Sequence, residues 1–259
     1  MNIVVCVKQV PDTWAERKLK QDDSTLDRES VDGVINELDE YAIEEGLQQA
    51  EAHGGEVTIL TMGPQKASDS IRKALSMGAD KAVQVTDEAL RGSDGLVTSA
   101  VLASVLGRTG FDLVILGSES TDARMGTLAA MLAERLGVPQ MSFASQVETD
   151  GSKISIRRQA DYGYDTVEAT LPAVVSVVEK INEPRYPSFK GIMAAKKKPV
   201  EILSLADLGM QPDQAGLAAS ATQVVSFASR PPRAAGTVMT DDGDGGVKAA
   251  EFLATRKFI

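Results

Sequence analysis

The sequence is very poor in the residues that carry thiol, metal and imidazole chemistry. It has a single cysteine, Cys6, and a single histidine, His53. One cysteine cannot form a disulfide within the chain, and one cysteine with one histidine cannot supply a structural zinc site. Cys6 lies in an apolar run and is best interpreted as a small core residue. His53 precedes two glycines at a predicted helix end, where capping is its simpler role.

Long apolar runs and basic excess are also missing. No apolar run approaches the roughly 18 residues needed to span a bilayer, so we expect no membrane insertion. The formal net charge is -10, which argues against a surface for nucleic acid or anionic membranes. No signal-peptide pattern follows Met1, and we expect a cytoplasmic location. Proteins and small molecules are the expected partners.

Familiar catalytic motifs are absent as well. The sequence contains no nucleophile elbow, no P-loop and no Gly-x-Gly-x-x-Gly. We therefore predict a protein that is not an enzyme with catalytic residues of its own.

What the sequence does contain is an alternation of strand and helix patterns. Apolar residues make up 43 % and aromatics only 4 %, which favours an interior of Val, Ile, Leu and Ala. Such alternation predicts an α/β fold, a Rossmann-like parallel sheet with helices on both faces. Strands are predicted over 2–8, 57–62, 82–85, 111–116 and 173–178, helices over 37–53, 66–77, 93–107 and 124–136, and a small excursion over 21–36.

The pattern changes twice in the second half of the chain. Strand-like runs over 141–148, 153–160 and 164–170 predict an antiparallel addition to the sheet. Residues 1–190 are expected to form a nucleotide-binding α/β domain. The stretch from about 200 to 259 has weak periodicity, yet its scattered apolar residues suggest that it folds against something else.

Ligands of parallel sheets bind beyond the carboxyl ends of the strands, which directs attention to the loops after Lys8, Met62 and Gly117. The loop 117–127 combines two glycines, several hydroxyl groups and a following helix N-terminus, a combination that suits a phosphate. Arg124 could add a bidentate contact. The local pattern leaves open that Ser120 and its neighbours only cap a helix. The run 196–198 of three lysines is typical of a solvated surface.

Four separated segments resemble one family. They are Val4–Thr13, Asn36–Glu45 (with Glu37 where the family usually has proline), Gly63-Pro64 with Ala74–Asp80, and Leu171–Val175 followed by Asn182–Lys198. In this order they resemble the β (small) subunits of electron-transfer flavoproteins, from residue 2 to about 209. The segment Asn182–Lys198 is the most specific of the four.

The resemblance implies an αβ heterodimer. In this family FAD is held mainly by the α subunit, and the β subunit commonly binds AMP. Residues 191–259 would hold the end of a recognition loop and a C-terminal arm that wraps the α subunit. One departure concerns the phosphate: Gly126-Thr127-Leu128-Ala129 stands where many β subunits have Asn-Gln/Ala-Thr-Gly. The nucleotide contacts implied are Cys6, Val7, Lys8, Asn36, Glu37, Leu38, Asp39, Met62, Gly63, Gly117, Ser118, Glu119, Ser120, Thr121, Asp122, Ala123, Arg124, Met125, Gly126, Thr127 and Leu128.

The resemblance also implies two contact regions. Pro187–Ala195 corresponds to a recognition loop that docks primary dehydrogenases, with Phe189 as its apolar anchor and Tyr186, Ile192 and Met193 beside it. The alternative is that Phe189 packs inside. Thr13 and Trp14 are expected near the flavin. Electrons would pass from the dehydrogenase to the shared FAD and on to a membrane quinone oxidoreductase or another acceptor.

Two alternatives remain open at this level. One is a stand-alone nucleotide-binding protein of the universal-stress type, which needs neither Asn182–Lys198 nor the long tail. The other is a bifurcating flavoprotein that holds a second FAD in the β site. The number of flavins per heterodimer, none, one or two, separates the three.

Overall fold

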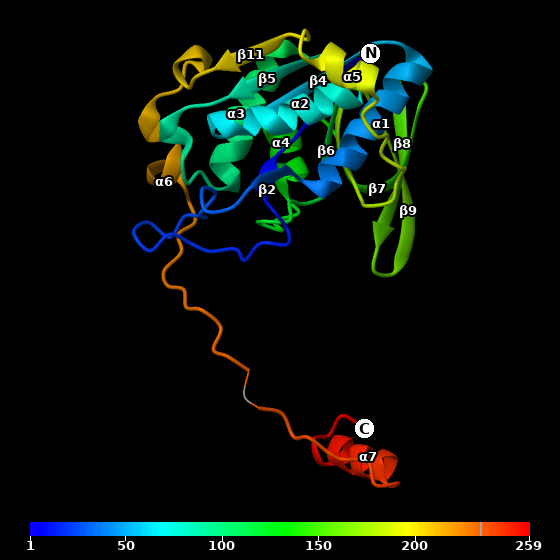
Figure 1. Cartoon of the computed structure of the whole chain (residues 1–259). Helices are drawn as coiled ribbons and strands as arrows, with labels where there is room; N and C mark the ends of the chain where they lie inside the picture. The colour runs from blue at the N-terminus through cyan, green and yellow to red at the C-terminus, as the bar shows by residue number, and fades with distance from the viewer. Residues whose placement is uncertain (234) are drawn as a thin grey trace. The chain divides into compact units, whose positions relative to one another are not determined.

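The computed structural model describes residues 1–233 and 235–259, which form two compact units, Met1–Val224 and Val225–Ile259 (Figure 1). The first unit is built on a nine-stranded sheet of order β11-β5-β4-β1-β6-β10-β7-β8-β9. Seven neighbouring strands run parallel, and the alternating sequence pattern predicts five of them, β1, β4, β5, β6 and β10. The seven are β11 (Val200–Leu203), β5 (Lys81–Val85), β4 (Glu56–Met62), β1 (Asn2–Cys6), β6 (Leu113–Gly117), β10 (Ala173–Val177) and β7 (Gln140–Thr149).

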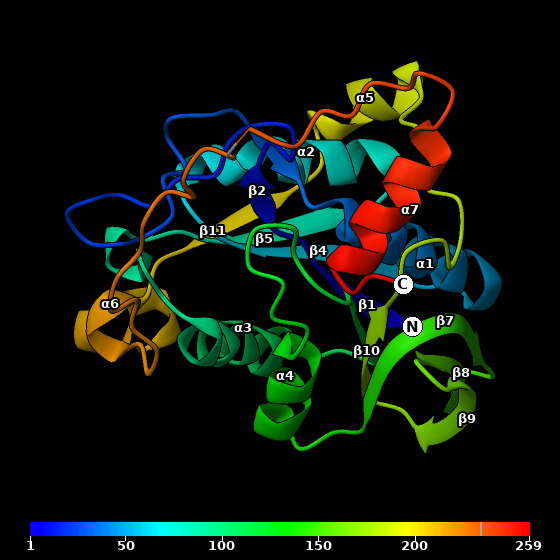
Figure 2. The same cartoon turned by 90° about the horizontal axis from the view of Figure 1, so that it is seen from below.

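Helices cover both faces of this sheet, which confirms the predicted fold class (Figure 2). On one face lie α1 (Glu37–His53) and α2 (Ser68–Met77), and on the other lie α3 (Gly95–Thr109) and α4 (Leu128–Leu136). Strand β1 shows why both are needed: Ile3 and Val5 pack toward the first pair of helices, and Val4 and Cys6 toward the second. Successive side chains of a strand point to opposite faces, so an apolar strand needs cover on both.

The order of connections reverses beside β1. From β1 the chain continues to β4 and β5 on one side, and later returns to β6 and β10 on the other. The loops after β1 and β6 therefore lie on either side of this reversal at the carboxyl edge, the place where sheets of this kind bind ligands.

The predicted antiparallel addition is confirmed for its last two runs, which form the hairpin of β8 (Lys153–Ala160) and β9 (Gly163–Thr170). The assignment of the first run, 141–148, to the addition alone is wrong, because it also pairs parallel with β10. The hairpin is connected to the parallel strands by β7, which pairs parallel with β10 and antiparallel with β8. Phe143 has a φ of 60° within β7, and the pairing shifts register between Ala144 and Gln146. A bulge of this kind bends a strand, which lets one strand serve both partners.

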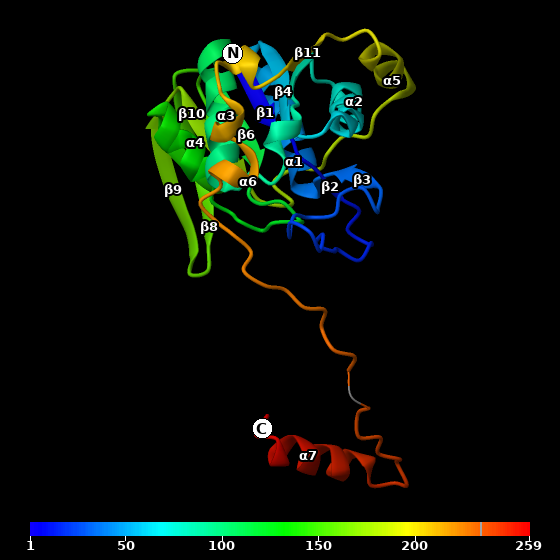
Figure 3. The same ribbon diagram turned by 90° about the vertical axis from the view of Figure 1, so that its left-hand side faces the viewer.

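The excursion after β1 contains a small second sheet. Strands β2 (Gln9–Pro11) and β3 (Gly33–Ile35) pair antiparallel, and residues 12–32 connect them beyond the carboxyl edge (Figure 3).

Residues after 190 still add structure to the first unit. Helix α5 (Phe189–Ala195) contacts α2, and β11 extends the sheet by pairing with β5. The sheet thus extends past residue 190. The sequence pattern is weak there because β11 has only four residues and one buried side chain. Short elements follow: η3 (Ala206–Leu208), η4 (Pro212–Gln214) and α6 (Gly216–Ala219); earlier ones are η1 (Gln65–Ala67) and η2 (Glu88–Leu90).

The second unit contains helix α7 (Gly245–Thr255). None of the side chains described in this unit is buried, and Val225 and Val238 are 93 % and 90 % exposed. In the described part of the chain, no helix has the length and apolar character to cross a membrane.

Candidate functional site

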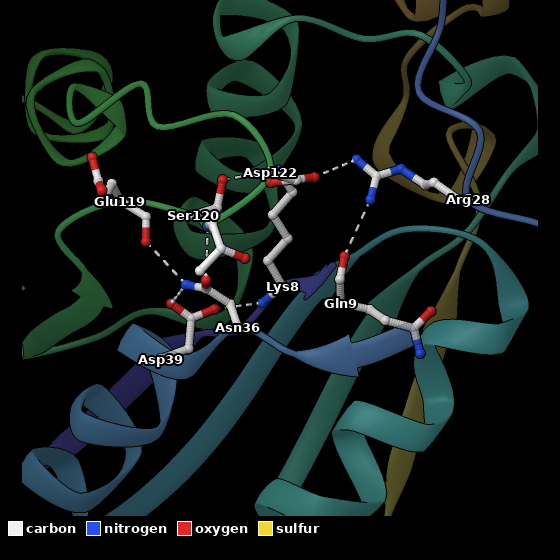
Figure 4. Close-up of polar contacts among 9 residues, drawn as sticks. Lys8, Gln9, Arg28, Asn36, Asp39, Glu119, Ser120 and Asp122 are labelled. Carbon is white, nitrogen blue, oxygen red and sulfur yellow. Dashed lines mark hydrogen bonds and ion pairs between the residues drawn. The ribbon is translucent and has the colours of Figure 1, made fainter. Parts of the chain in front are cut away.

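Three polar segments meet at the carboxyl edge of the sheet, beside the reversal in strand order (Figure 4). They are the end of β1 with Lys8, the start of α1 with Asn36 and Asp39, and the loop after β6 with Ser120 and Asp122. The resemblance implied that all three contact one nucleotide, and in the structure hydrogen bonds join them to one another.

Asp39 joins these segments through its buried carboxylate. One oxygen accepts the backbone N–H of Lys8 at 2.7 Å, and the other accepts the side-chain amide of Asn36 at 2.9 Å. Burial raises the pKa of Asp39 to about 7, although these donors and the backbone N–H of Gly117 favour its charged form. A Cβ at Gly117 would lie 2.6 Å from Asp39 Oδ1, so the end of β6 requires glycine here.

Asn36 holds the loop after β6 against the start of α1. Its Nδ2 donates to the carbonyl of Glu119 at 3.0 Å, and its Oδ1 accepts the backbone N–H of Thr121 at 3.1 Å. Its own backbone N–H donates to the carbonyl of Lys8 at 2.9 Å. Asn36 is buried, and these bonds satisfy both ends of its amide. The residue thus has a positioning role that its place before a helix alone does not reveal.

Asp122 is the centre of a charge cluster. Its carboxylate accepts from Lys8 Nζ at 2.6 Å and from Arg28 at 2.8 Å, and its side chain is only 1 % exposed. Burial alone would raise the pKa of Asp122, but Lys8, Ser120 and Arg28 together lower it to about 2. The alternative that Ser120 and Asp122 cap the following helix is wrong, because these side chains bind Lys8.

Arg28 was not among the residues that the sequence singled out. It lies in the connection between β2 and β3, bonds Asp122, and donates to the carbonyl of Gln9 at 3.3 Å. The pairing spans 94 residues and joins a segment without a motif to the loop after β6. No local pattern could have found it.

The loop after β6 is longer than predicted. The expected helix over 124–136 begins only at Leu128, because Arg124 and Gly126 have φ values of 48° and 66°, outside helical geometry. Thr127 precedes the helix without capping it through its side chain. The first amides of α4 are therefore left for another acceptor. Ala123, Arg124, Met125 and Thr127 are exposed.

One hydroxyl in this loop has no partner. The side-chain oxygen of Thr121 is enclosed and makes no hydrogen bond within the described chain. An orphaned polar atom, free helix amides and an exposed arginine together suit a phosphate, so these residues fit a nucleotide. A Cβ at Gly126 would meet nothing within 4 Å.

The other residues expected to contact a nucleotide differ in their exposure to solvent. Cys6 is buried in the core on the α3–α4 face, where burial raises the pKa of its thiol to about 12. Val7 is buried too, and its N–H donates to Leu60 of the adjacent strand β4 at 2.9 Å. Met62 ends β4, and Gly63 follows it. Glu37 is exposed, Leu38 is half-buried, and both face a cavity on the far side of α1. Ser118 donates its backbone N–H to Val177 at 2.9 Å.

The expected recognition loop is a helix, α5, which corrects the prediction of a segment without regular structure. Ser188 caps it by accepting the N–H of Gly191 at 3.0 Å, and a Cβ at Gly191 would lie 2.4 Å from the carbonyl of Ser76 on α2. The tight contact turns the apolar side chains outward. Exposed are Phe189 at 81 %, Tyr186 at 94 %, Ile192 at 46 % and Met193 at 48 %, so the alternative of an internal Phe189 is wrong.

The segment before α5 is fixed to α1 by charge. Arg185 donates to both oxygens of Glu44, at 2.8 and 2.9 Å, and reaches Glu51 at 2.6 Å. Asn182 donates to the carbonyl of Tyr41 at 3.1 Å. These side chains hold the segment that leads into α5 against α1.

The segment after α5 is held as well. Lys198 donates to the carbonyls of Leu75, Gly78 and Ala79, at 3.0, 3.0 and 2.6 Å. The expectation of a purely solvated lysine run is thus wrong at this position, where the ammonium satisfies the end of α2.

Thr13 and Trp14 follow β2 in the connection to β3. Trp14 is 96 % exposed, and Thr13 bonds only weakly to Glu37, at 3.5 Å. The structure therefore leaves the indole available for contact.

The fold thus defines an α/β protein with a polar site at the carboxyl edge of a parallel sheet. The electron transfer flavoprotein domain family matches residues 23–208. An electron transfer flavoprotein subunit beta of Mycobacterium tuberculosis is 51 % identical over 100 % of this chain and 99 % of its own length. A protein of the same name from Thermoanaerobacterium thermosaccharolyticum is 37 % identical over 96 % and 95 %. The caffeyl-CoA reductase-Etf complex subunit CarD of Acetobacterium woodii is 37 % identical over 93 % and 92 %.

The chain belongs to the electron transfer flavoprotein family, among its β subunits. This membership confirms the resemblance seen in the sequence and supports a role in electron transport together with a flavin. It also sets aside the stand-alone alternative, because the matches extend over the full length.

Proposed function

We propose that this chain is the β subunit of a heterodimeric electron-transfer flavoprotein, an electron carrier without catalytic residues of its own. It binds an α subunit and shares one FAD with it. It accepts electrons from primary dehydrogenases through that FAD and passes them to a membrane quinone oxidoreductase or another acceptor.

The observation that carries this proposal is the full-length match to proteins named as β subunits, which includes the segment after Val224. Val225 and Val238 are almost fully exposed there. Burying such side chains on a partner is favourable by about 25 cal/mol per Å² of apolar surface. We assign to Val225–Ile259, the second compact unit, the role of an arm that wraps the α subunit.

The site after β6 is proposed to bind the phosphate of AMP. The free amides at the start of α4, the hydroxyl of Thr121 and the guanidinium of Arg124 supply donors. Lys8 and Arg28 already neutralise Asp122, so this carboxylate does not repel an anion. Backbone amides near Gly126 replace the side-chain donors that many β subunits have in this place.

The flavin supplies the electron-accepting and electron-donating chemistry when it is bound. Thr13 and Trp14 are proposed to approach it from the β side, since the indole is exposed in a loop beyond the carboxyl edge. This chain would orient the cofactor and shield it from water.

The exposed face of α5 is proposed to dock primary dehydrogenases. Phe189 is the anchor, because exposed aromatic residues with fixed backbones are frequent hot spots of interfaces. A relative from Acetobacterium woodii carries the name of a reductase-Etf complex subunit, which agrees with docking to an oxidoreductase.

Coexpression with the α subunit tests the proposal. We expect the isolated chain to be colourless and incompletely ordered, and the coexpressed pair to purify as a yellow 1:1 complex. The order of Val225–Ile259 can be followed by hydrogen exchange in both samples. Stoichiometric FAD on the isolated chain would contradict the proposal.

A further inference from the structure

A cavity of about 320 Å³ lies next to the proposed docking face. It is bounded by the first half of α1, by the second half of α2 and by the segment 183–187 that leads into α5. It belongs neither to the site after β6 nor to the core. Its walls are partly apolar and aromatic, formed by Leu38, Tyr41, Met77, Pro184 and Tyr186.

The polar part of the lining is predominantly acidic. Glu37, Glu40, Glu179 and Glu183 contribute carboxylates, and the lining includes only two cationic side chains, Lys73 and Arg185.

Both cations already have carboxylate partners. Lys73 pairs with Glu40. The guanidinium of Arg185 is directed to Glu44 and Glu51 of α1, with four hydrogen bonds of 2.6 to 3.2 Å.

The carboxylates of Glu37 and Glu183 are left without a counterion. Within the described residues, neither has a cationic partner within 4 Å, and Glu179 reaches only Lys180, at 4.0 Å. The cavity therefore carries uncompensated negative charge beside aromatic surface.

We propose that this cavity receives an arginine side chain of the oxidoreductase that docks on α5. The inference rests on the proposed docking function and names the chemistry of the partner. A guanidinium is flat, stacks on tyrosine rings and pairs with carboxylates in bidentate geometry. An anionic or purely apolar group would leave Glu37 and Glu183 unpaired and partly desolvated.

The cavity adjoins the exposed face of α5, which supports an arginine of the docked partner as its occupant. Tyr186 lines the cavity and also belongs to the exposed apolar set, and Phe189 follows three residues later. Arg185 and Ser188 fix the segment between them. A partner surface that covers Phe189 would thus lie over the cavity mouth, and one partner can engage both.

The test uses the αβ complex with ¹³C-labelled methionine methyl groups. Met77 lines the cavity and Met193 lies on α5, so the two signals report on separate places. N-acetyl-arginine amide is titrated in, with N-acetyl-citrulline amide as the neutral analogue of the same shape. We expect the arginine probe to shift Met77 and not Met193, and the citrulline probe to bind at least threefold more weakly.

Charge-neutral variants complete the test. Glu183→Gln and Glu37→Gln should each weaken binding of the arginine probe about threefold, and Glu168→Gln, on the exposed face of β9, should leave it unchanged. Equal binding of the two probes, or an unchanged affinity in both cavity variants, would overturn the proposal. Phe189→Ala should leave probe binding intact, so a failure of the docking function is distinguishable from a failure of the cavity.

Discussion

Replacement of Phe189 by alanine separates docking from folding. The side chain is 81 % exposed, so only about a fifth of its surface is covered in this chain. Aromatic side chains bury roughly 150–250 Å² when fully enclosed, which gives about 40 Å² here. At about 25 cal/mol per Å², its loss costs at most about 1 kcal/mol of unfolding free energy. A core phenylalanine would cost about 3–5 kcal/mol.

Phe189→Ala should weaken docking of the dehydrogenase far more than it lowers the unfolding free energy. An aromatic anchor in a partner pocket typically contributes about 2 kcal/mol or more, so Phe189→Ala should weaken docking roughly 30-fold or more. The helix itself survives, since Ser188 still caps it and alanine favours helix. The assay measures reduction of the FAD in the αβ complex by its dehydrogenase. We expect a raised apparent KM for the flavoprotein, with FAD content unchanged.

Tyr162 provides the matched control. It is an aromatic residue of similar exposure, 79 %, in the turn between β8 and β9. Tyr162→Ala should leave the apparent KM unchanged, and both variants should melt within about 3 °C of the parent complex. Normal turnover of Phe189→Ala, together with a large loss of stability, would refute the reasoning and make Phe189 a packing residue.

Three further changes probe the site and its supports. Thr121→Val should lower AMP retention and leave the unfolding free energy equal or higher, because the hydroxyl has no partner in the protein; reduced stability with normal AMP content would contradict this. Lys198→Met should cost about 1–3 kcal/mol in urea unfolding, since three carbonyls lose their donor, and Lys196→Met should cost nothing measurable. The pKa of Asp122 is lowered from 3.8 to about 2, so its stabilisation of about 2 kcal/mol is present above pH 4 and lost as the pH falls toward 2. Asp122→Asn should therefore lose more unfolding free energy at pH 6 than at pH 2.5, relative to the parent. An equal loss at the two pH values would contradict a stabilising role of the ion cluster.

A substitution at Gly126 needs care in its design. A branched side chain in Gly126→Val would be expected to crowd the approach of a phosphate to the backbone. In the structure the space around Gly126 is open, but its φ of 66° strains a β-branched residue. Loss of nucleotide in that variant would report backbone strain as much as crowding. Asparagine tolerates this φ and is the better comparison.

The parallel core could be predicted from sequence because the signals for its strands and helices lie within short segments of the chain. Each buried strand is a short apolar run, each helix ends near a glycine, and alternation of the two dictates a parallel sheet. Strand β11 escaped because Val200–Leu203 is brief, and its partner β5 lies 118 residues earlier in the chain. Helix α5 escaped because seven residues give too little periodicity, and its contact with α2 through Gly191 is tertiary.

The location of the candidate site could be predicted from the sequence, but its hydrogen bonds and ion pairs could not. The carboxyl-edge rule directed attention to Lys8 and the loop after Gly117, which the structure joins through Asp122. The apolar spacing of Met125 and Leu128 suggested that the helix extends into this loop, yet Arg124 and Gly126 leave helical geometry. Asp122 is drawn toward Lys8 and Arg28, which lie 114 and 94 residues away in sequence. Partners at such separations leave no trace in local pattern.

The central proposal is tested most directly by the nucleotide content of the native αβ complex. The complex is purified without added nucleotide and denatured, and the released nucleotides are counted per heterodimer by mass spectrometry. One FAD and one AMP per heterodimer are predicted. Two FAD would indicate a bifurcating flavoprotein with flavin in the β site, and a complex without FAD would contradict the proposed function.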